Sequence, residues 1–166
     1  HEAVITLPGL FAQSPQGDAK VAELFEQLGV CTQREGNSVT LKKTHTHTDR
    51  MVYNFVNQPD LAQTFVVTCA MLGIPFRFSG LQSLKIKETD RMAALIAEMH
   101  KLGYVLEESE GSVLSWNGTR CTPDESPAID TYEDHRMAMA FAPAAFCNST
   151  LRIRNPHVVS KSYPRF

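Results

Sequence analysis

The fold is most clearly encoded in one stretch, residues 88–116, which reads ETDRMAALIAEMHKLGYVLEESEGSVLSW. Its first half repeats apolar residues at helical spacing, which predicts an amphipathic helix over Glu88–Leu102. Gly103 comes next, and glycine suits the left-handed position just beyond a helix end. Val105–Glu108 and Ser112–Trp116 then read as strands on either side of a Ser-Glu-Gly turn. The stretch therefore predicts a helix that leads into a β-hairpin.

The Leu-Gly-apolar ending of this helix occurs twice more, at residues 28–30 and 72–74. The first copy also leads into a hairpin pattern, and we expect Asp18 to cap its helix. The second copy ends a helix that is predicted to begin near Asp60. The remaining predicted strands are Ala3–Leu7, Cys31–Arg34, Ser38–Lys42, Met51–Phe55, Phe76–Ser79 and Thr150–Arg154.

Two predicted helical segments, Leu61–Leu72 and Met137–Phe146, are apolar nearly all round, which is typical of buried helices. Repeated strand, helix and hairpin units of this kind predict an α+β fold in which sheets pack around a layer of buried helices. Residues 117–129, which contain two prolines, are expected to form an irregular loop.

Composition narrows the possible functions. A net charge of -2 over 166 residues gives no global basic field, so we expect no nucleic-acid partner. The sequence has no run of about 18 apolar residues, so we expect no membrane span. Four cysteines without CxxC spacing indicate buried, reduced thiols in a cytoplasmic protein; Cys69 and Cys147 lie in apolar runs.

Charged residues gather at two predicted helix starts. Lys85–Arg91 contains three cations, and Lys87 and Arg91, four residues apart, are expected to share a helix face. Glu133–Arg136 comes directly before the apolar run at 137–140, where Asp134 can cap the helix. Helix starts favour anions, so cations placed there indicate a negatively charged ligand. The alternative is a solvated charge run with an ordinary cap.

Three further positions invite a functional interpretation. Asp60, after Pro59, is either a helix cap or a carboxylate placed to accept a proton from a substrate hydroxyl. Lys161, between two serines, is either a surface lysine or an anion ligand. His45 and His47 would share one face of a strand, but two imidazoles without a third ligand are weak evidence, so we expect no metal site.

The order and spacing of two motifs resemble the carboxyvinyltransferase family, and within it the shikimate-pathway branch, the EPSP synthases. These motifs are Lys-Glu-Thr-Asp-Arg at 87–91 and Asp-His-Arg-Met-Ala at 134–138. Gln16-Gly17-Asp18, Pro59-Asp60 and the Lys-Ser-Tyr-Pro ending at 161–164 agree as well. The resemblance covers nearly the whole chain.

The resemblance implies a two-domain enzyme whose domains each contain three βαβαββ units, with substrates bound between the domains. It implies that residues 1–166 are a single domain, the C-terminal portion of a monomeric parent, and that the N-terminal domain is absent. We therefore expect the chain alone to bind substrates weakly and to show no measurable turnover.

The implied reaction transfers the enolpyruvyl group of phosphoenolpyruvate to the 5-hydroxyl of shikimate 3-phosphate and releases phosphate, without a metal or organic cofactor. Asp60 matches the family's proton acceptor, and Glu88 matches its proton donor to the methylene carbon. Ser83 stands where the family often has an asparagine ligand. The substrate-binding residues implied by the resemblance are Ser83, Lys87, Arg91, His135, Arg136 and Lys161.

Within this set, Lys87 matches a ligand of shikimate 3-phosphate, whereas Arg91, Arg136 and Lys161 match the cations that hold phosphoenolpyruvate. Both substrates are polyanions, which explains the choice of arginine and lysine. Two alternatives remain open at this point. One is the cell-wall carboxyvinyltransferase, which acts on a nucleotide-linked amino sugar, and the other is a non-catalytic anion-binding module.

Overall fold

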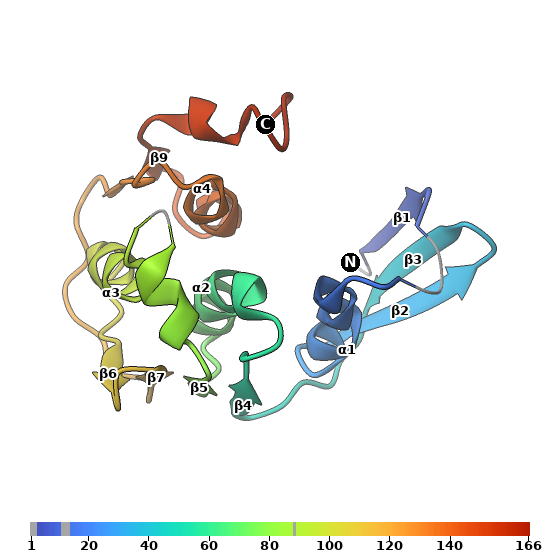
Figure 1. Ribbon diagram of the computed structural model, residues 1–166, viewed down its shortest axis with the longest axis horizontal. Helices are drawn as coiled ribbons and strands as arrows, with labels where there is room; N and C mark the ends of the chain where they lie inside the picture. Colours follow the sequence, from blue (N-terminus) through green and yellow to red (C-terminus); the bar gives the residue numbers. More distant parts are fainter. Residues whose placement is uncertain (1–2, 11–13, 88) are drawn as a thin grey trace. The chain divides into compact units, whose positions relative to one another are not determined.

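A computed structural model describes residues 3–10, 14–87 and 89–166 of the chain. The chain divides into two compact units, which we call unit 1 (His1–Asp49) and unit 2 (Arg50–Phe166) (Figure 1). Each unit combines helices with a β-sheet, and unit 2 segregates its helices to one face of its main sheet. The predicted α+β class is confirmed.

Unit 1 contains a three-stranded antiparallel sheet in the order β1-β3-β2. A short helix comes before β2 in the sequence. Helix α1 (Val21–Glu26) packs against β2, and Leu24 of the helix, Leu28 just after it and Val39 of β3 are buried. Gln16, not Asp18, occupies the N-cap position of the 3₁₀ turn η1 that leads into α1, so the expected Asp18 cap is wrong. The bounds are β1 Val4–Pro8, η1 Gly17–Lys20, β2 Val30–Glu35 and β3 Ser38–Lys43.

Unit 2 begins with one complete βαβαββ unit. Its four-stranded sheet has the order β4-β5-β7-β6, in which β4 and β5 are parallel and the other pairs are antiparallel. A further helix, α4, connects the parallel strands β8 and β9. The bounds are β4 Met51–Asn54, α2 Ala62–Leu72, β5 Phe76–Ser79, α3 Arg91–Lys101, β6 Glu107–Ser109, β7 Val113–Trp116, β8 Ala128–Ile129, α4 His135–Phe141 and β9 Arg152–Ile153.

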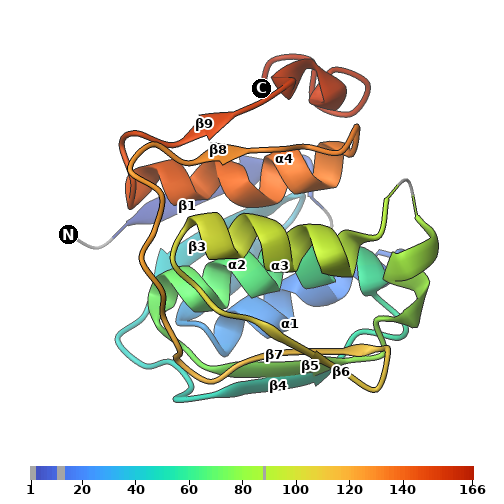
Figure 2. The same cartoon turned by 90° about the vertical axis from the view of Figure 1, so that its left-hand side faces the viewer.

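The elements of unit 2 stack in layers. Helices α2 and α3 lie on one face of the four-stranded sheet, and α4 lies beyond them, next to β8 and β9 (Figure 2). Because α2 has the sheet on one side and α3 and α4 on others, it buries residues nearly all round. Its apolar character is therefore explained, as the sequence predicted. The rings of Phe55, Phe65, Phe76 and Phe78 fill the space between α2 and the sheet.

The start of α3 differs from the prediction. The helix begins at Arg91, and Asp90 caps it by accepting hydrogen bonds from the amides of Met92 and Ala93. Lys87 follows a separate 3₁₀ turn, η3 (Gln82–Ile86), and has extended backbone angles. Lys87 and Arg91 therefore do not share a helix face. Residues 117–127 form an irregular segment as expected, whereas Ala128–Ile129 form β8, which pairs with β9.

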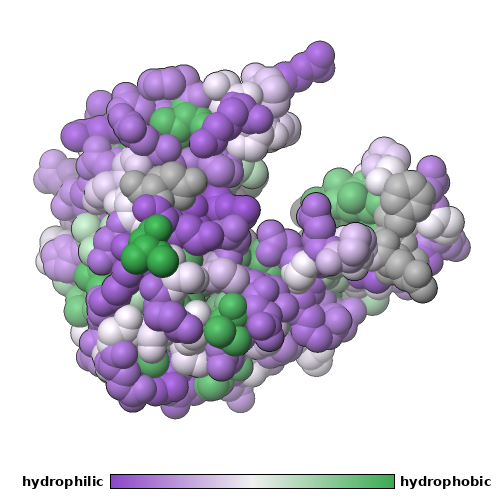
Figure 3. Space-filling view, in the orientation of Figure 1, coloured by the Kyte–Doolittle hydropathy of each residue, from purple (hydrophilic) through white to green (hydrophobic). Residues whose placement is uncertain are grey.

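Surface and thiol exposure follow from these layers. Cys69 is buried in α2 as expected, but Cys147, which follows the 3₁₀ turn η4 (Ala142–Phe146), is exposed. All four cysteines are free thiols. Hydrophobic side chains on the visible surface are scattered among hydrophilic ones (Figure 3), which is ordinary for a folded protein. Within the described ranges, none of the helices is both long and apolar enough to span a bilayer.

Candidate functional site

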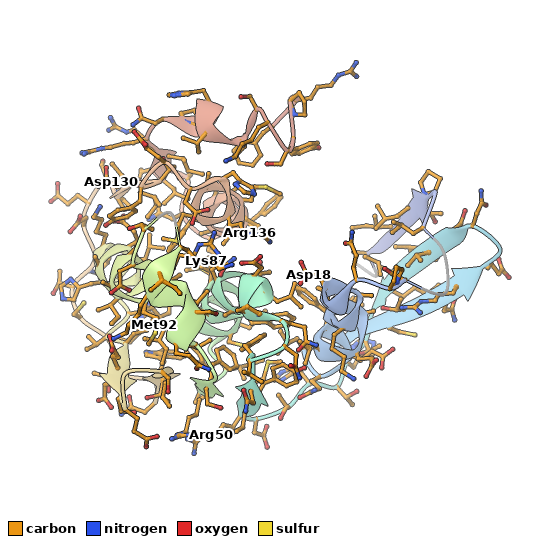
Figure 4. The ribbon with its side chains drawn as sticks, in the orientation of Figure 1. Asp18, Arg50, Lys87, Met92, Asp130 and Arg136 are labelled. Atoms are coloured by element: carbon orange, nitrogen blue, oxygen red, sulfur yellow. The ribbon has the colours of Figure 1, made fainter. Side chains whose placement is uncertain are left out.

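Three cations from different segments converge on one carboxylate, that of Asp60. Asp60 lies in the 3₁₀ turn η2 (Pro59–Leu61), which leads into α2. Its Oδ1 is 2.8 Å from Arg91 NH1 and 3.5 Å from Lys87 Nζ, and its Oδ2 is 3.0 Å from Arg136 NH2. Figure 4 shows Lys87 and Arg136 side by side in this region. Two charged motifs that lie far apart in the sequence thus form one cluster with Asp60, which we call the Asp60 cluster.

Arg91 joins two carboxylates at the centre of the cluster. Its NH1 donates to Asp60, and its Nε donates to Oδ2 of Asp134. The Arg91 side chain is 2% exposed and that of Asp134 is fully buried. Asp134 also caps α4, because its other oxygen accepts the Arg136 amide hydrogen at 2.9 Å. One arginine therefore ties together the starts of α2, α3 and α4.

Backbone contacts fix Asp60 itself. The buried side chain of Gln63, one turn along the chain, donates from Nε2 to the Asp60 carbonyl at 2.6 Å. Arg136 NH1 donates to the same carbonyl at 3.4 Å. Asp60 does not cap α2, because no side-chain cap is formed there and Gln58 holds the N-cap position of η2. The carboxylate is instead turned toward the cations, which argues against the simple cap interpretation.

Charge balance governs the protonation of this site. Burial raises the pKa of Asp60, but the charge of Arg136, the hydrogen bond from Arg91 and the charge of Lys87 outweigh it, so the pKa lies below its usual value. Burial would lower the pKa of Arg91, but its bonds to Asp134 and Asp60 raise it above its usual value. Among the described members, three cations face two carboxylates, which leaves an excess of one positive charge. The cluster suits an added anion.

The other predicted site residues are placed as follows. Glu88 lies outside the described residues, so its role as proton donor stays a prediction. Ser83 is half-buried in η3, four residues before Lys87. His135 begins α4; its Nδ1 is buried, lies 4.0 Å from Asp134 and has no hydrogen-bond partner among the residues that the structure describes. Lys161 lies in an exposed turn after η5 (Pro156–Val159), and it is not among the three cations around Asp60.

The sequence reasoning missed the second role of Asp134. It predicted a cap, and the structure shows that the same carboxylate also receives the buried Arg91. The available signal was the pairing of an aspartate with a cation in each of two motifs, at 90–91 and at 134–136. In the part of the chain that the structure describes, no group of three His, Cys, Asp or Glu side chains is arranged to hold a metal ion.

Comparison with known proteins identifies the family of the chain. The family model for EPSP synthase (3-phosphoshikimate 1-carboxyvinyltransferase) matches residues 1–166. The chain belongs to the EPSP synthase family. A 3-phosphoshikimate 1-carboxyvinyltransferase of Bacteroides fragilis is 58% identical over 165 residues, which are 99% of this chain and 40% of that relative. The recognition made from the two charged motifs is confirmed.

More distant EPSP synthases match over the same extent. The protein of Cellvibrio japonicus is 33% identical, covering 98% of this chain and 37% of its own length. The chloroplastic protein of Solanum lycopersicum is 35% identical, and the match covers 98% of this chain and 32% of that protein. The chain thus spans about two fifths or less of these relatives. The solved EPSP synthase of Acinetobacter baumannii has a TM-score of 0.65 at 16% identity, covering 97% of this chain and 39% of that one, which supports the fold.

The ion pairs of Asp60 should make the stability of unit 2 depend on pH in the acid range. The folded-state pKa of Asp60 lies below its usual value of 3.8, so the stabilisation is complete above the unfolded-state pKa and is lost as pH falls through the folded-state pKa. We expect the difference in unfolding free energy between wild type and Asp60→Asn to be constant above about pH 5 and to shrink below about pH 4.

This difference can be measured by urea unfolding. The single tryptophan, Trp116, is buried in β7, so its fluorescence reports the unfolding of unit 2. Exposed Asp124, in the same unit, offers a matched Asp-to-Asn substitution, Asp124→Asn, that leaves the Asp60 cluster intact. A wild-type advantage over Asp60→Asn that persists unchanged to about pH 2.5 would show that the ion pairs do not depress this pKa.

Proposed function

We propose that this chain is the C-terminal portion of a transferase that moves the enolpyruvyl group of phosphoenolpyruvate to the 5-hydroxyl of shikimate 3-phosphate and releases phosphate. The observation that carries the proposal is the convergence of Lys87, Arg91 and Arg136 on Asp60 in a member of the EPSP synthase family. The relatives described above are named for the shikimate acceptor, which favours it over the nucleotide-linked amino sugar.

The three cations differ in solvent exposure, and they therefore suit different roles. The side chains of Lys87 and Arg136 are each 32% exposed, so they can meet a phosphate or carboxylate group directly. The Arg136 fork can bind such a group through two parallel hydrogen bonds. Arg91 is buried between two carboxylates, so in this arrangement it holds the other groups in position. Ser83, His135 and Lys161 are proposed as further contacts on the strength of the family match.

Asp60 suits the role of proton acceptor from the substrate hydroxyl. Its carboxylate is ionised at neutral pH, and its side chain is partly exposed beside the two accessible cations. An anion bound to Lys87 and Arg136 would offset the positive charge that lowers the pKa of Asp60, so the carboxylate becomes a stronger base once substrate is bound. The same cations would stabilise negative charge on the intermediate and on the departing phosphate.

The proton balance of the reaction requires a second group. The hydroxyl oxygen adds to C2 of phosphoenolpyruvate and loses its proton, while C3 gains one. In the elimination, the C2–O bond to phosphate breaks and C3 gives up a proton, so that C3 becomes a methylene carbon again. Glu88 is proposed as the donor to C3, from its position in the 87–91 motif. This chemistry needs no metal or organic cofactor. We also propose a cytoplasmic, monomeric parent whose N-terminal domain completes the substrate site.

Equilibrium binding of phosphoenolpyruvate tests this assignment. In the full-length protein, with a 5-deoxy analogue of shikimate 3-phosphate present, which lacks the reacting hydroxyl, Arg136→Ala should raise the dissociation constant of phosphoenolpyruvate by about 10- to 100-fold, because a charge-assisted contact contributes about 1.5–3 kcal/mol. Isothermal titration calorimetry measures this constant directly and does not require turnover.

Arg120→Ala is the matched control. Arg120 is exposed and its guanidinium stacks over the ring of Tyr104, which follows the C-terminal end of α3, whereas the cluster lies at the start of that helix. Its loss should leave the dissociation constant within about twofold. If Arg136→Ala bound phosphoenolpyruvate as tightly as wild type, the cluster would not be the substrate site and the proposal would fail.

A further inference from the structure

A second charged cluster in unit 2 surrounds Glu98, a residue that the reaction described above does not use. The Glu98 carboxylate lies in the middle of α3 and is fully buried. Its Oε2 is 2.6 Å from Lys101 Nζ and accepts the Asp130 amide hydrogen at 3.1 Å, and its Oε1 accepts from the Tyr132 hydroxyl at 2.7 Å. A buried carboxylate is stable only when it is paired and hydrogen-bonded in this way.

Four contacts from Glu98 and Lys101 reach the segment that precedes α4, and two of them are the Glu98 bonds to Asp130 and Tyr132. Lys101 Nζ donates to the Ala128 carbonyl at 3.1 Å and lies 2.8 Å from Oδ2 of Asp130. Asp130, labelled in Figure 4, also pairs with Arg154 at 3.3 Å. Glu98 and Lys101 of α3 therefore hold residues 128–132 through contacts with both backbone and side-chain atoms of that segment.

The chain then makes a turn at residues 132–133 whose backbone conformation is energetically unfavourable. Tyr132 and Glu133 have φ angles of 53° and 57°, in the left-handed region that side-chain-bearing residues rarely adopt. Such strain persists only where the surroundings over-determine it. Here Glu98 holds the hydroxyl of Tyr132, the first of the two left-handed residues, and Arg91 holds Asp134, which follows them. The Asp134 amide also donates to the Thr131 carbonyl at 2.8 Å.

Helix α3 thus holds the turn at two points on one face. Arg91 and Glu98 are seven residues apart, two helical turns, so both lie toward the 130–134 segment. The turn sets where Asp134 caps α4 and hence where Arg136, two residues later, meets Asp60. Without these contacts from α3, relaxation of the two left-handed residues would move the first turn of α4 relative to α3.

We propose that Glu98 and Tyr132 are positioning residues: their hydrogen bond holds the strained 130–134 turn so that Arg136 stays in the Asp60 cluster. This inference rests on the proposed function, since it is through Arg136 that the bond reaches the bound anion. Neither residue touches substrate in this proposal. Both act on phosphoenolpyruvate affinity through the position of α4.

Tyr132→Phe tests the proposal, because it removes one hydroxyl and leaves the ring. In the full-length protein, with the same unreactive 5-deoxy analogue of shikimate 3-phosphate present, we expect calorimetry to show that the dissociation constant of phosphoenolpyruvate rises about tenfold. Two controls separate positioning from stability. Tyr104→Phe removes another hydroxyl of unit 2, and Val113→Ala opens a cavity in β7, in the sheet on the other side of α2 and α3 from α4. Both should bind within about twofold of wild type, even where Val113→Ala lowers the melting temperature more than Tyr132→Phe does.

The outcomes are distinct. Normal binding by Tyr132→Phe, alongside weakened binding by Arg136→Ala, would overturn the positioning role and leave the proposed function standing. Normal binding by both variants would overturn the proposed function as well. Equal weakening by Val113→Ala and Tyr132→Phe would show a general effect of stability and would also overturn the positioning role.

Discussion

Replacing Arg91 with alanine should lower the free energy of unfolding of unit 2 by about 3–5 kcal/mol, a large part of the stability of an ordinary domain. The Arg91 side chain is 2% exposed and its Nε donates to a fully buried carboxylate. Its removal leaves Asp134 charged, buried and without its guanidinium partner. Urea unfolding of the chain, followed by Trp116 fluorescence, gives the difference in free energy.

Two companion variants identify the cause of that loss. Arg77→Ala removes an exposed arginine of the same unit, 3.5 Å from Glu110, and should change the free energy by no more than about 0.5 kcal/mol. Adding Asp134→Asn to Arg91→Ala removes the orphaned charge while keeping a capping residue, so the double variant should be more stable than Arg91→Ala by about 1–2 kcal/mol. An equally unstable double variant would mean that lost packing, not the buried charge, dominates.

Much of the fold follows from local patterns in the sequence. The Leu-Gly endings located three helix ends, and in the structure Gly29, Gly73 and Gly103 all have positive φ angles. Alternation and turn residues located both hairpins. Strand ends were less predictable: β6 begins at Glu107 instead of Val105, because hairpin pairing with β7 starts only at Ser115.

The site was predictable in part, for a physical reason. Local charge placement at 85–91 and 133–136 marked the cations, since electrostatics disfavours them at helix starts. That Arg91 would be buried against Asp134, 43 residues away, depends on how α3 and α4 pack, which no local pattern encodes. Glu98 was missed for the same reason. It sits in the buried stripe of α3 beside Leu95 and Met99, where a charge is costly until Lys101, Asp130 and Tyr132 satisfy it.

Asp60→Asn should reduce the turnover number of the full-length protein by about 10²–10⁴-fold, the range for loss of a general base. The amide has nearly the same size as the carboxylate but cannot accept the hydroxyl proton. Steady-state production of phosphate from phosphoenolpyruvate and shikimate 3-phosphate measures the effect. Exposed Asp124, in the same unit, provides the control, and Asp124→Asn should retain normal turnover. Unchanged turnover in Asp60→Asn would favour a non-catalytic anion-binding role for the cluster.

The pH profile separates proton transfer from simple organisation of the cations. If Asp60 accepts the proton, wild-type turnover falls at acid pH as the carboxylate is protonated in the substrate complex. That limb should lie above the depressed pKa of the free protein, because bound phosphoenolpyruvate offsets the charge of Arg136 and Lys87. The residual turnover of Asp60→Asn should lack the limb, since an amide does not titrate. A variant that keeps the wild-type acid limb at lower amplitude would assign Asp60 to holding the cations and the proton transfer to another group.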